Sequence, residues 1–335
     1  KDLVFAKYDR PKVVVATNVA QTSITIPDID VVVDSGLERL PTLDKHGVPG
    51  LTLADVSQAD CLQRMGRAGR TRDGYYFLCG SPFEKRAKFP EPQIYTDRFD
   101  AVLLRLLYGK LNIKKLMFLD PPKSHQVKLA TERLKDLGAL KKGGVTLTPA
   151  GEQMVAYPLD PEYGRMVVEA KRRDVLTNVL GIVACASVRG IVNQDERRAS
   201  ASSHESDFII QMEEFISLNL QLNADRPDDV DAWLEQRGII PRRFHRAVDV
   251  YFKLCELENV TPFQNIRAQN KRKDVLACIV SGLWPWGVYL ASGRHATDIH
   301  GEKRLVSKFS AVYAEDEFVV GEPFNLDGVS DSGEM

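Results

Sequence analysis

Two runs of consecutive valines constrain the fold of this chain more than any other feature. Residues 13–15 and residues 31–33 contain only valine. Uninterrupted β-branched runs are typical of strands that are buried on both faces of a sheet flanked by helices. A third run, at residues 75–79, is aromatic and apolar and predicts one more strand. The chain is therefore predicted to begin with an α/β domain.

The segment between the second and third runs has a different pattern. Between Gly36 and Val56, two moderately apolar stretches flank a cluster at residues 46–50 that contains Gly and Pro. Such a cluster favours a turn over a helix. Residues 36–56 are therefore predicted to form an antiparallel hairpin that projects from the sheet.

Helical patterns follow the α/β domain, which is assigned residues 1–94. Two amphipathic helices end near Gly109 and Gly138, and a short β-hairpin comes after the second one. Next, Thr148 and the proline after it are typical of the start of a helix. Together these elements predict a winged-helix domain at residues 95–157.

The second half of the chain changes from helical to β texture. The spacing of apolar residues predicts an all-α bundle at residues 158–272. Residues 273–328 are aromatic, β-branched and rich in Gly, which predicts a small β-barrel with strands near residues 304–306 and 318–320. The last seven residues, 329–335, are predicted to be a frayed tail. A chain of 335 residues fits several such units.

Composition excludes some functional classes and leaves others open. The 45 Lys and Arg residues balance 46 Asp and Glu residues, so any basic surface for nucleic acid must be local. No apolar run is long enough to cross a bilayer. The five cysteines have no metal-binding spacing and are interpreted as buried, reduced, intracellular thiols. The first residues lack a signal sequence and an initiator Met, which suggests a truncated chain.

The octapeptide Gln63 to Arg70, with sequence QRMGRAGR, carries the strongest functional signal. Its arginines recur every three residues, so on a helix they would share one side. The glycines between them allow a ligand to approach the backbone closely. Guanidinium groups suit phosphate, and an arginine finger neutralises charge on a transferring phosphoryl group. By itself, however, the pattern also fits a surface helix with a basic stripe.

A second segment makes the octapeptide more specific. Residues 16–26, ATNVAQTSITI, closely resemble motif V of DEAH-box helicases, and Gln63 to Arg70 resembles their motif VI. The predicted hairpin between the two motifs is also similar to that family. The resemblance continues in FLDPP at residues 118–122, in LTPAG at residues 147–151 and in PLDP at residues 158–161.

This resemblance implies a multidomain α/β plus α fold. It would contain part of a second RecA-like domain with the hairpin, then a winged helix, a helical-bundle or ratchet domain, and an OB-like β-barrel. The implied activity is ATP-dependent translocation on nucleic acid, or its remodelling, with RNA a better candidate than DNA. The implied cofactor is ATP with Mg²⁺, held mainly by a first RecA-like domain. The hairpin would act as a wedge that separates or grips strands.

The resemblance also assigns roles within motif VI. Arg67 and Arg70 would be arginine fingers that reach the triphosphate, and Gln63 would position the attacking water or the γ-phosphate. Arg64 would organise the neighbouring loop, although a structural ion pair is an equal alternative, and Gly66 would support the nucleotide site.

In motif V, the candidate contacts to the nucleic-acid backbone are Thr17, Asn18, Thr22 and Ser23. Short hydroxyl and amide side chains can donate to phosphate, and such contacts carry no base information. These residue types also favour local capping and turn bonds in any sequence. Gln21 departs from the family, which usually has Glu there, and this removes a negative charge from motif V.

The predicted barrel offers a further candidate surface. Trp286, Arg294 and His295 could stack on bases and contact phosphates. Aromatic residues in a small barrel are more often part of its core. An activating protein partner at this domain is the other expectation.

The chain contains no G-x-x-x-x-G-K-[ST] phosphate loop and no Asp-Glu-Ala-His sequence. We therefore expect it to be inactive by itself, as a fragment of a longer cytoplasmic or nuclear helicase. The alternatives are a non-catalytic module that binds nucleic acid or protein, and a pseudo-helicase scaffold.

Overall fold

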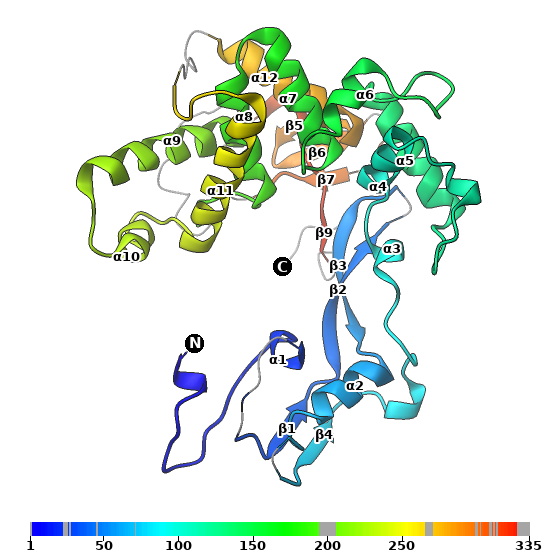
Figure 1. The fold of residues 1–335 in the computed structure, drawn as a ribbon, viewed down its shortest axis with the longest axis vertical. Coiled ribbons are helices and arrows are strands. Elements are labelled where there is room, and N and C mark those ends of the chain that lie inside the picture. Colours follow the sequence, from blue (N-terminus) through cyan, green and yellow to red (C-terminus); the bar gives the residue numbers. More distant parts are fainter. Residues whose placement is uncertain are drawn as a thin grey trace. The chain divides into compact units, whose positions relative to one another are not determined.

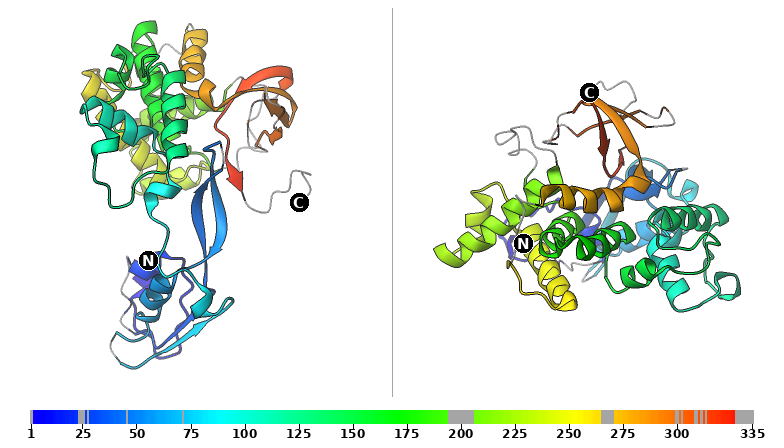
Figure 2. Two further views of the ribbon diagram at one scale, coloured as in Figure 1. Left: turned by 90° about the vertical axis from the view of Figure 1, so that its right-hand side faces the viewer. Right: turned by 90° about the horizontal axis from the view of Figure 1, so that it is seen from above.

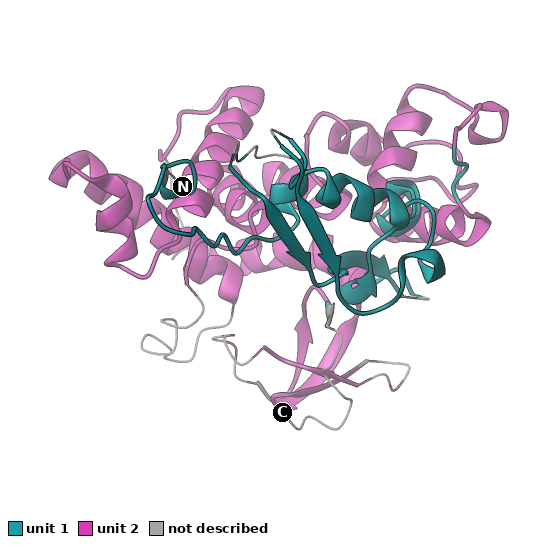
Figure 3. Cartoon of the chain, turned by 90° about the horizontal axis from the view of Figure 1, so that it is seen from below, with its two compact units in different colours: residues 1–98, 120–122, 324–329 teal, residues 99–119, 123–323, 330–335 magenta. Residues whose placement is uncertain are grey.

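The computed structural model describes residues 2–22, 26, 28–44, 46–70, 72–193, 206–264, 271–298, 301, 303–307, 310, 312 and 314–326. The chain divides into two compact units, which Figure 3 draws in different colours. Unit 1 contains residues 1–98, 120–122 and 324–329, and unit 2 contains the remaining residues.

A small parallel sheet forms one part of unit 1 (Figure 1). Strand β1 (Val31–Asp34) pairs in parallel with β4 (Tyr75–Leu78), and helix α2 (Gln58–Met65) packs against both strands. The strands predicted at residues 31–33 and 75–79 are therefore confirmed.

The burial predicted for these strands is wrong on one face of the sheet. Val31 pairs with Tyr75 and Val33 pairs with Phe77, and all four side chains are exposed. Helix α2 packs against the sheet, whereas these four side chains remain uncovered.

The strand predicted at residues 13–15 is not observed. These residues have no regular structure, and Val13 and Val15 are almost fully exposed. A β-branched run becomes a strand only when a neighbouring strand satisfies its backbone groups. No described strand pairs with residues 13–15.

The predicted hairpin is confirmed. Strands β2 (Leu37–Leu43) and β3 (Pro49–Asp55) are antiparallel along their full lengths and lie side by side in Figures 1 and 2. At the tip, the Asp44 carboxylate accepts hydrogen bonds from the amides of His46 at 2.8 Å and Val48 at 2.9 Å. An Asp side chain that bonds its own turn in this way closes the loop between the strands.

The other elements of unit 1 are short. A short parallel strand, β9 (Asn325–Leu326), pairs with the free edge of β3. The described helical turns of unit 1 are η1 (Asp2–Val4), α1 (Val19–Thr22), η2 (Phe83–Lys85) and α3 (Gln93–Thr96).

Unit 2 begins with the helices predicted on either side of the short β-hairpin, together with one 3-10 turn. These elements are α4 (Asp100–Tyr108), η3 (Ile113–Lys115), α5 (Ser124–Asp136) and α6 (Pro149–Met154). The hairpin between α5 and α6 is reduced to one antiparallel bridge between Leu140 and Leu147. Thr148 caps α6 as predicted, because its hydroxyl accepts a 3.1 Å hydrogen bond from the Gly151 amide.

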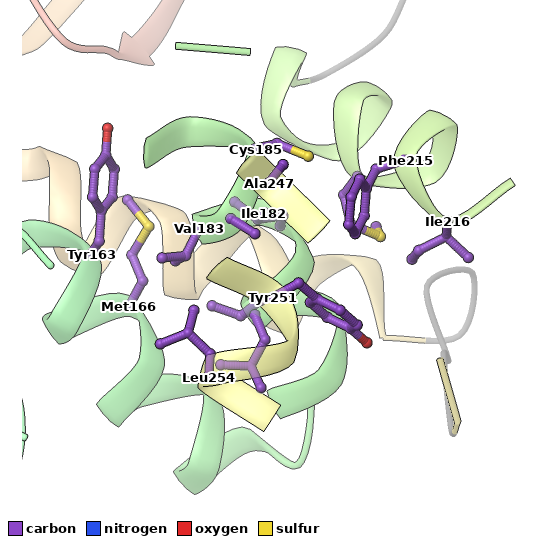
Figure 4. Close-up of a cluster of buried hydrophobic side chains, with 14 of the residues drawn as sticks. Tyr163, Met166, Ile182, Val183, Cys185, Phe215, Ile216, Ala247, Tyr251 and Leu254 are labelled. Carbon is purple, nitrogen blue, oxygen red and sulfur yellow. The ribbon is translucent and has the colours of Figure 1, made fainter. Parts of the chain in front are cut away.

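A helical bundle forms the largest core of the molecule. Its helices are α7 (Pro161–Arg173), α8 (Leu176–Ser187), α9 (Asp207–Asp225), α10 (Val230–Glu235), α11 (Pro241–Glu258) and α12 (Arg272–Leu283). Helix α8 is buried almost all round, since α7, α9 and α11 each pack against it. Figure 4 shows Ile182 and Val183 of α8 among side chains such as Phe215 and Tyr251.

A four-stranded antiparallel sheet follows the bundle, in the order β7-β6-β5-β8. A 3-10 turn, η5 (Trp284–Trp286), leads into the strands β5 (Val288–Gly293), β6 (His295–Asp298), β7 (Lys303–Leu305) and β8 (Ala314–Val320). In the described residues β7 and β8 remain edges and do not pair, so the barrel predicted for residues 273–328 is not shown.

Burial of the cysteines follows the prediction with one exception. Cys61, Cys185, Cys255 and Cys278 are buried, whereas Cys79 is exposed. Cys79 lies just beyond the end of β4, where the sheet no longer covers it.

Candidate functional site

Helix α2 carries the first two candidate residues of motif VI. The helix begins at Ser57, whose hydroxyl accepts a 3.1 Å hydrogen bond from the Asp60 amide and donates one of 2.6 Å to the Asp60 carboxylate. This cap holds the first turn of the helix in place. One turn further on, Gln63 is exposed, and the side chain of Arg64 is only 13% exposed.

The arginines of motif VI do not share one helical face, so that part of the prediction is wrong. Gly66 ends the helix, and its amide donates back to the Leu62 carbonyl at 3.0 Å. Arg64 is on the helix, while Arg67 and Arg70 lie in the turns beyond it.

Arg64 forms a buried ion-pair network at the end of β1. Its Nη1 lies 2.9 Å from Asp34 Oδ1, and its Nη2 lies 3.5 Å from Glu38 Oε2. Asp34 also accepts hydrogen bonds from the Gly36 amide at 2.9 Å and from the Tyr76 hydroxyl at 2.8 Å. Two roles were predicted for Arg64, and the structure shows one of them directly, the structural ion pair.

Two carboxyl groups around Arg64 have opposite pKa shifts. Burial raises the pKa of Asp34, but the hydrogen bonds from Gly36, Tyr76 and Arg64 outweigh this effect, so the pKa lies below its ordinary value. The pKa of Glu38 is raised, first by burial and then by the charge of Asp60. The charges of Asp60 and Asp34 thus act on the pKa of Glu38 in the opposite direction to the charge of Arg64.

Gln21 joins motif V to motif VI. Its Nε2 donates to Asp60 Oδ1 at 2.6 Å and to Gln63 Oε1 at 3.2 Å. Its Oε1 accepts a 2.9 Å hydrogen bond from Arg64 Nε, and its backbone carbonyl accepts one from Arg67 Nη2. These residues are about 40 positions apart in the sequence, and only the fold brings them together.

Arg67 and Arg70 form a pair of neighbouring positive charges. Burial lowers the pKa of Arg67, and the charge of Arg70 lowers it further. Arg70 itself is exposed. Two guanidinium groups that oppose each other's charge favour an anion beside them, and phosphate is the anion that suits their geometry.

The motif V candidates lie at α1. The carbonyls of Thr17 and Asn18 accept the turn bonds that begin this helix, from Ala20 at 3.1 Å and Gln21 at 3.0 Å. The side chains of Thr17, Asn18 and Thr22 are exposed. Their backbones thus build the local turn, while their side chains face solvent. Ser23 lies outside the described residues.

The three candidates of the predicted barrel do not form one surface. Trp286 stacks on the Arg133 guanidinium, 4.1 Å from the ring centroid, and packs against the helical core. Arg294 and His295 are exposed at the other end of β5, about 20 Å along the strand. Trp286 therefore packs against the helical bundle, and not in the core of a barrel as the alternative interpretation expected.

Arg86 is a buried organiser of unit 1 that the sequence did not predict. Its side chain has no exposed surface, and it donates to the carbonyls of Gly36 at 2.6 Å, Val56 at 3.2 Å and Ser81 at 3.1 Å. It thus ties the base of the hairpin to the segment after β4. An isolated arginine in a Pro-containing connector gives no signal of this role.

No group of three or more His, Cys, Asp or Glu side chains in the described residues could hold a metal ion. No helix in that part of the chain has the length and apolarity needed to span a membrane.

Three family models match this chain. The helicase conserved C-terminal domain matches residues 3–72. The winged-helix part of the helicase-associated HA2 domain matches residues 130–159, and its ratchet-like part matches residues 160–226. The α/β, winged-helix and helical parts of the predicted fold class are therefore present.

Curated relatives match most of this chain. The ATP-dependent RNA helicase DHX33 of Mus musculus is 34% identical over 281 residues, covering 82% of this chain and 40% of the relative. DHX33 of Drosophila melanogaster is 29% identical over 322 residues, covering 90% and 45%. The splicing factor and ATP-dependent RNA helicase prp22 of Schizosaccharomyces pombe is 29% identical, covering 81% and 24%. The chain thus spans less than half the length of these relatives.

A solved structure has the same fold. The crystal structure of the E. coli DExH-box NTPase HrpB superposes with a TM-score of 0.62 at 22% sequence identity. The match covers 87% of this chain and 31% of that one. The motifs, the three family models and the relatives together identify the family. The chain belongs to the DEAH-box helicase family and corresponds to the C-terminal portion of such a protein.

Proposed function

We propose that the intact protein is an ATP-dependent RNA helicase and that this chain supplies its arginine fingers and part of its RNA grip. The observation that carries the proposal is the link through Gln21, which contacts Gln63, Arg64 and Arg67 and lies in the short helix that includes Thr22 and follows Thr17 and Asn18. One short helix thus touches both the residues suited to ATP and those suited to RNA.

The division of labour follows from charge and geometry. Arg67 and Arg70 would neutralise charge that develops on the γ-phosphate, because both lie in the turns after α2 and the charge of Arg70 acts on Arg67. Gln63 would orient the attacking water, and Gly66 would let the chain turn beside the nucleotide. Arg64 holds this segment against Asp34 and so positions it.

The residues present suit ATP phosphates but not a metal ion. The two arginines offer donors for phosphate oxygens, whereas the described residues include no cluster of metal-ligating side chains. Mg²⁺ would therefore be held by the nucleotide and by residues beyond this chain.

RNA would be held by its backbone. Thr17, Asn18, Thr22 and Ser23 can contact phosphates, which would permit movement along RNA of any sequence. Relatives that are RNA helicases support RNA over DNA. We further propose that the protein works in the cytoplasm or nucleus, and that the sheet containing Arg294 and His295 is the place to look for an activating protein partner.

The finger assignment has a direct test in the full-length protein. Replacing Arg67 or Arg70 with Ala should lower the rate of ATP hydrolysis by about a thousandfold or more, because the transition-state charge loses its partner. Affinity for single-stranded RNA should remain nearly unchanged. ATP turnover and RNA binding are measured separately, by phosphate release and by fluorescence anisotropy.

Arg105→Ala is the matched control, because this arginine is exposed on α4 and is absent from the proposed site. It should turn over ATP at the wild-type rate. Wild-type turnover in both the Arg67 and Arg70 variants would contradict the finger assignment and favour a non-catalytic binding module.

A further inference from the structure

The side chain of Gln21 occupies a place that requires both a donor and an acceptor. Arg64 Nε can only donate, so it must face the amide oxygen, at 2.9 Å. The Asp60 carboxylate can only accept, so it must face the amide nitrogen, at 2.6 Å. An ionised carboxylate at residue 21 could satisfy Arg64 but would have no proton to give to Asp60.

The charges around the site make a second carboxylate there unfavourable. The groups that face residue 21 or Arg64 are Asp34 at the end of β1, Glu38 on β2, Asp60 and Arg64 on α2, and Arg67 after α2. The raised pKa of Glu38 already reflects burial and the charge of Asp60. A Glu at residue 21 would bring one more negative charge into this group, within hydrogen-bond distance of Asp60.

We propose that Gln21 and Asp60 form a matched donor–acceptor pair that positions motif VI for catalysis. This inference rests on the proposed ATPase function and deepens it. Gln21 is a positioning residue, because it acts through its contacts to Gln63, Arg64 and Arg67. Motif V of the family usually has Glu at this position. This chain can have Gln there because Asp60 accepts the hydrogen bond that the Gln21 amide donates.

Asp60 also has a second hydrogen-bond partner, which limits the substitutions that could swap the donor and the acceptor between residues 21 and 60. Its Oδ2 accepts a 2.6 Å hydrogen bond from the Ser57 hydroxyl, and its Oδ1 faces Gln21. An Asn at residue 60 could keep an oxygen toward Ser57 and turn its NH₂ group toward residue 21. Gln21→Glu combined with Asp60→Asn therefore reverses the donor and the acceptor without losing either hydrogen bond.

The experiment measures RNA-stimulated ATP hydrolysis by the full-length protein. Gln21→Glu should lower kcat by about tenfold or more, because it leaves the half-buried Asp60 carboxylate without this donor and displaces motif VI. The double variant Gln21→Glu/Asp60→Asn should recover most of the lost kcat. Asp60→Asn alone should lose less than Gln21→Glu alone, because two amides can still form a hydrogen bond.

The pH dependence separates positioning from a general loss of structure. A proton shared between the carboxylates of residues 21 and 60 would restore the missing donor, and such a proton is gained as the pH falls. The ratio of Gln21→Glu activity to wild-type activity should therefore rise between about pH 8 and about pH 6. In the double variant this ratio should stay flat. Circular dichroism and thermal unfolding check that every variant is folded.

Gln93→Glu is the matched control. Gln93 Nε2 donates to Asp97 Oδ2 at 2.5 Å on α3, but both side chains are exposed, so water screens the added charge. This variant should keep wild-type kcat. If the wild-type protein hydrolyses ATP and Gln21→Glu matches it, or if the double variant is no better than Gln21→Glu, the pairing is wrong. If the wild-type protein hydrolyses no ATP, the proposed function itself has failed.

Discussion

At the scale of single residues, some charged side chains of this protein form networks around one buried group. Glu169 is the clearest case, because Arg165, Arg172 and Arg173 of the same helix all donate to its carboxylate. Its side chain is 7% exposed. The basic segments at residues 171–173 and 271–273 likewise contain lysines or arginines that pair with acidic side chains of the bundle and its connections. They are therefore parts of the bundle's own ion pairs.

Glu169 predicts how stability depends on pH. Hydrogen bonds, first from Arg172, lower its pKa from 4.5 to about 2. A carboxyl group with a lowered pKa stabilises the folded state above its unfolded pKa, and this contribution disappears as the pH falls toward the folded pKa. The Glu169 carboxylate contributes at most about 3 kcal/mol to the free energy of unfolding.

The measurement compares Glu169→Gln with the wild type in urea unfolding at about pH 7 and about pH 3. At the higher pH the variant should have a lower free energy of unfolding than the wild type. On acidification its free energy of unfolding should fall by less than that of the wild type. Glu132→Gln, at an exposed glutamate of α5, is the control and should follow the wild type. Equal acid sensitivity of Glu169→Gln and the wild type would contradict the prediction.

At the scale of elements, helix ends were predictable where the cause is local. Gly109, Gly138 and Thr148 lie at the predicted ends because capping depends on a few adjacent residues. The end of α2 was missed, since the regular spacing of arginines in motif VI imitates a helix that Gly66 ends. The valine run at residues 13–15 failed for another reason: a strand depends on its neighbours, and spacing does not reveal them.

The packing of α7 against α12 gives a prediction at this scale. A Cβ on Gly282 would lie 2.4 Å from the Glu162 carbonyl oxygen and 2.7 Å from Met166 Cγ. These helices pack closely along their lengths, so a backbone oxygen cannot move aside cheaply. Gly282→Ala should therefore lower the free energy of unfolding by about 1–3 kcal/mol, despite the better helix propensity of Ala.

Thermal or urea unfolding measures this effect. Gly143→Ala is the control, because a Cβ there meets nothing within 4 Å. It should leave stability nearly unchanged. A Gly282→Ala variant as stable as the wild type would mean that α7 and α12 can separate without cost.

At the scale of the whole molecule, the proposed roles of ATP and RNA can be tested on this chain alone. The 335 residues contain no phosphate loop, so the chain by itself should not hydrolyse ATP. It should still bind single-stranded RNA, and the affinity should fall as salt rises, because the expected contacts are to phosphate. Anisotropy titrations at about 50 and about 200 mM salt measure this.

Two outcomes of that experiment would change the assignment. Binding that is independent of salt would indicate contacts other than phosphate and favour a protein partner. ATP hydrolysis by the chain alone would require a nucleotide site that its sequence does not contain. A charge-neutral RNA analogue is the control ligand and should bind weakly at both salt concentrations.

The sequence by itself determined the family, the order of the α/β, winged-helix and helical parts, and the hairpin between motifs V and VI. These depend on local spacing and on short motifs, which are complete within a few residues. Only the tertiary structure decided that Gln21 meets Asp60, that Arg86 lies buried at the hairpin base and that Trp286 stacks on Arg133. Such contacts join residues far apart in the chain, and their energy depends on burial and on the partner's charge. Neither can be read from one segment alone.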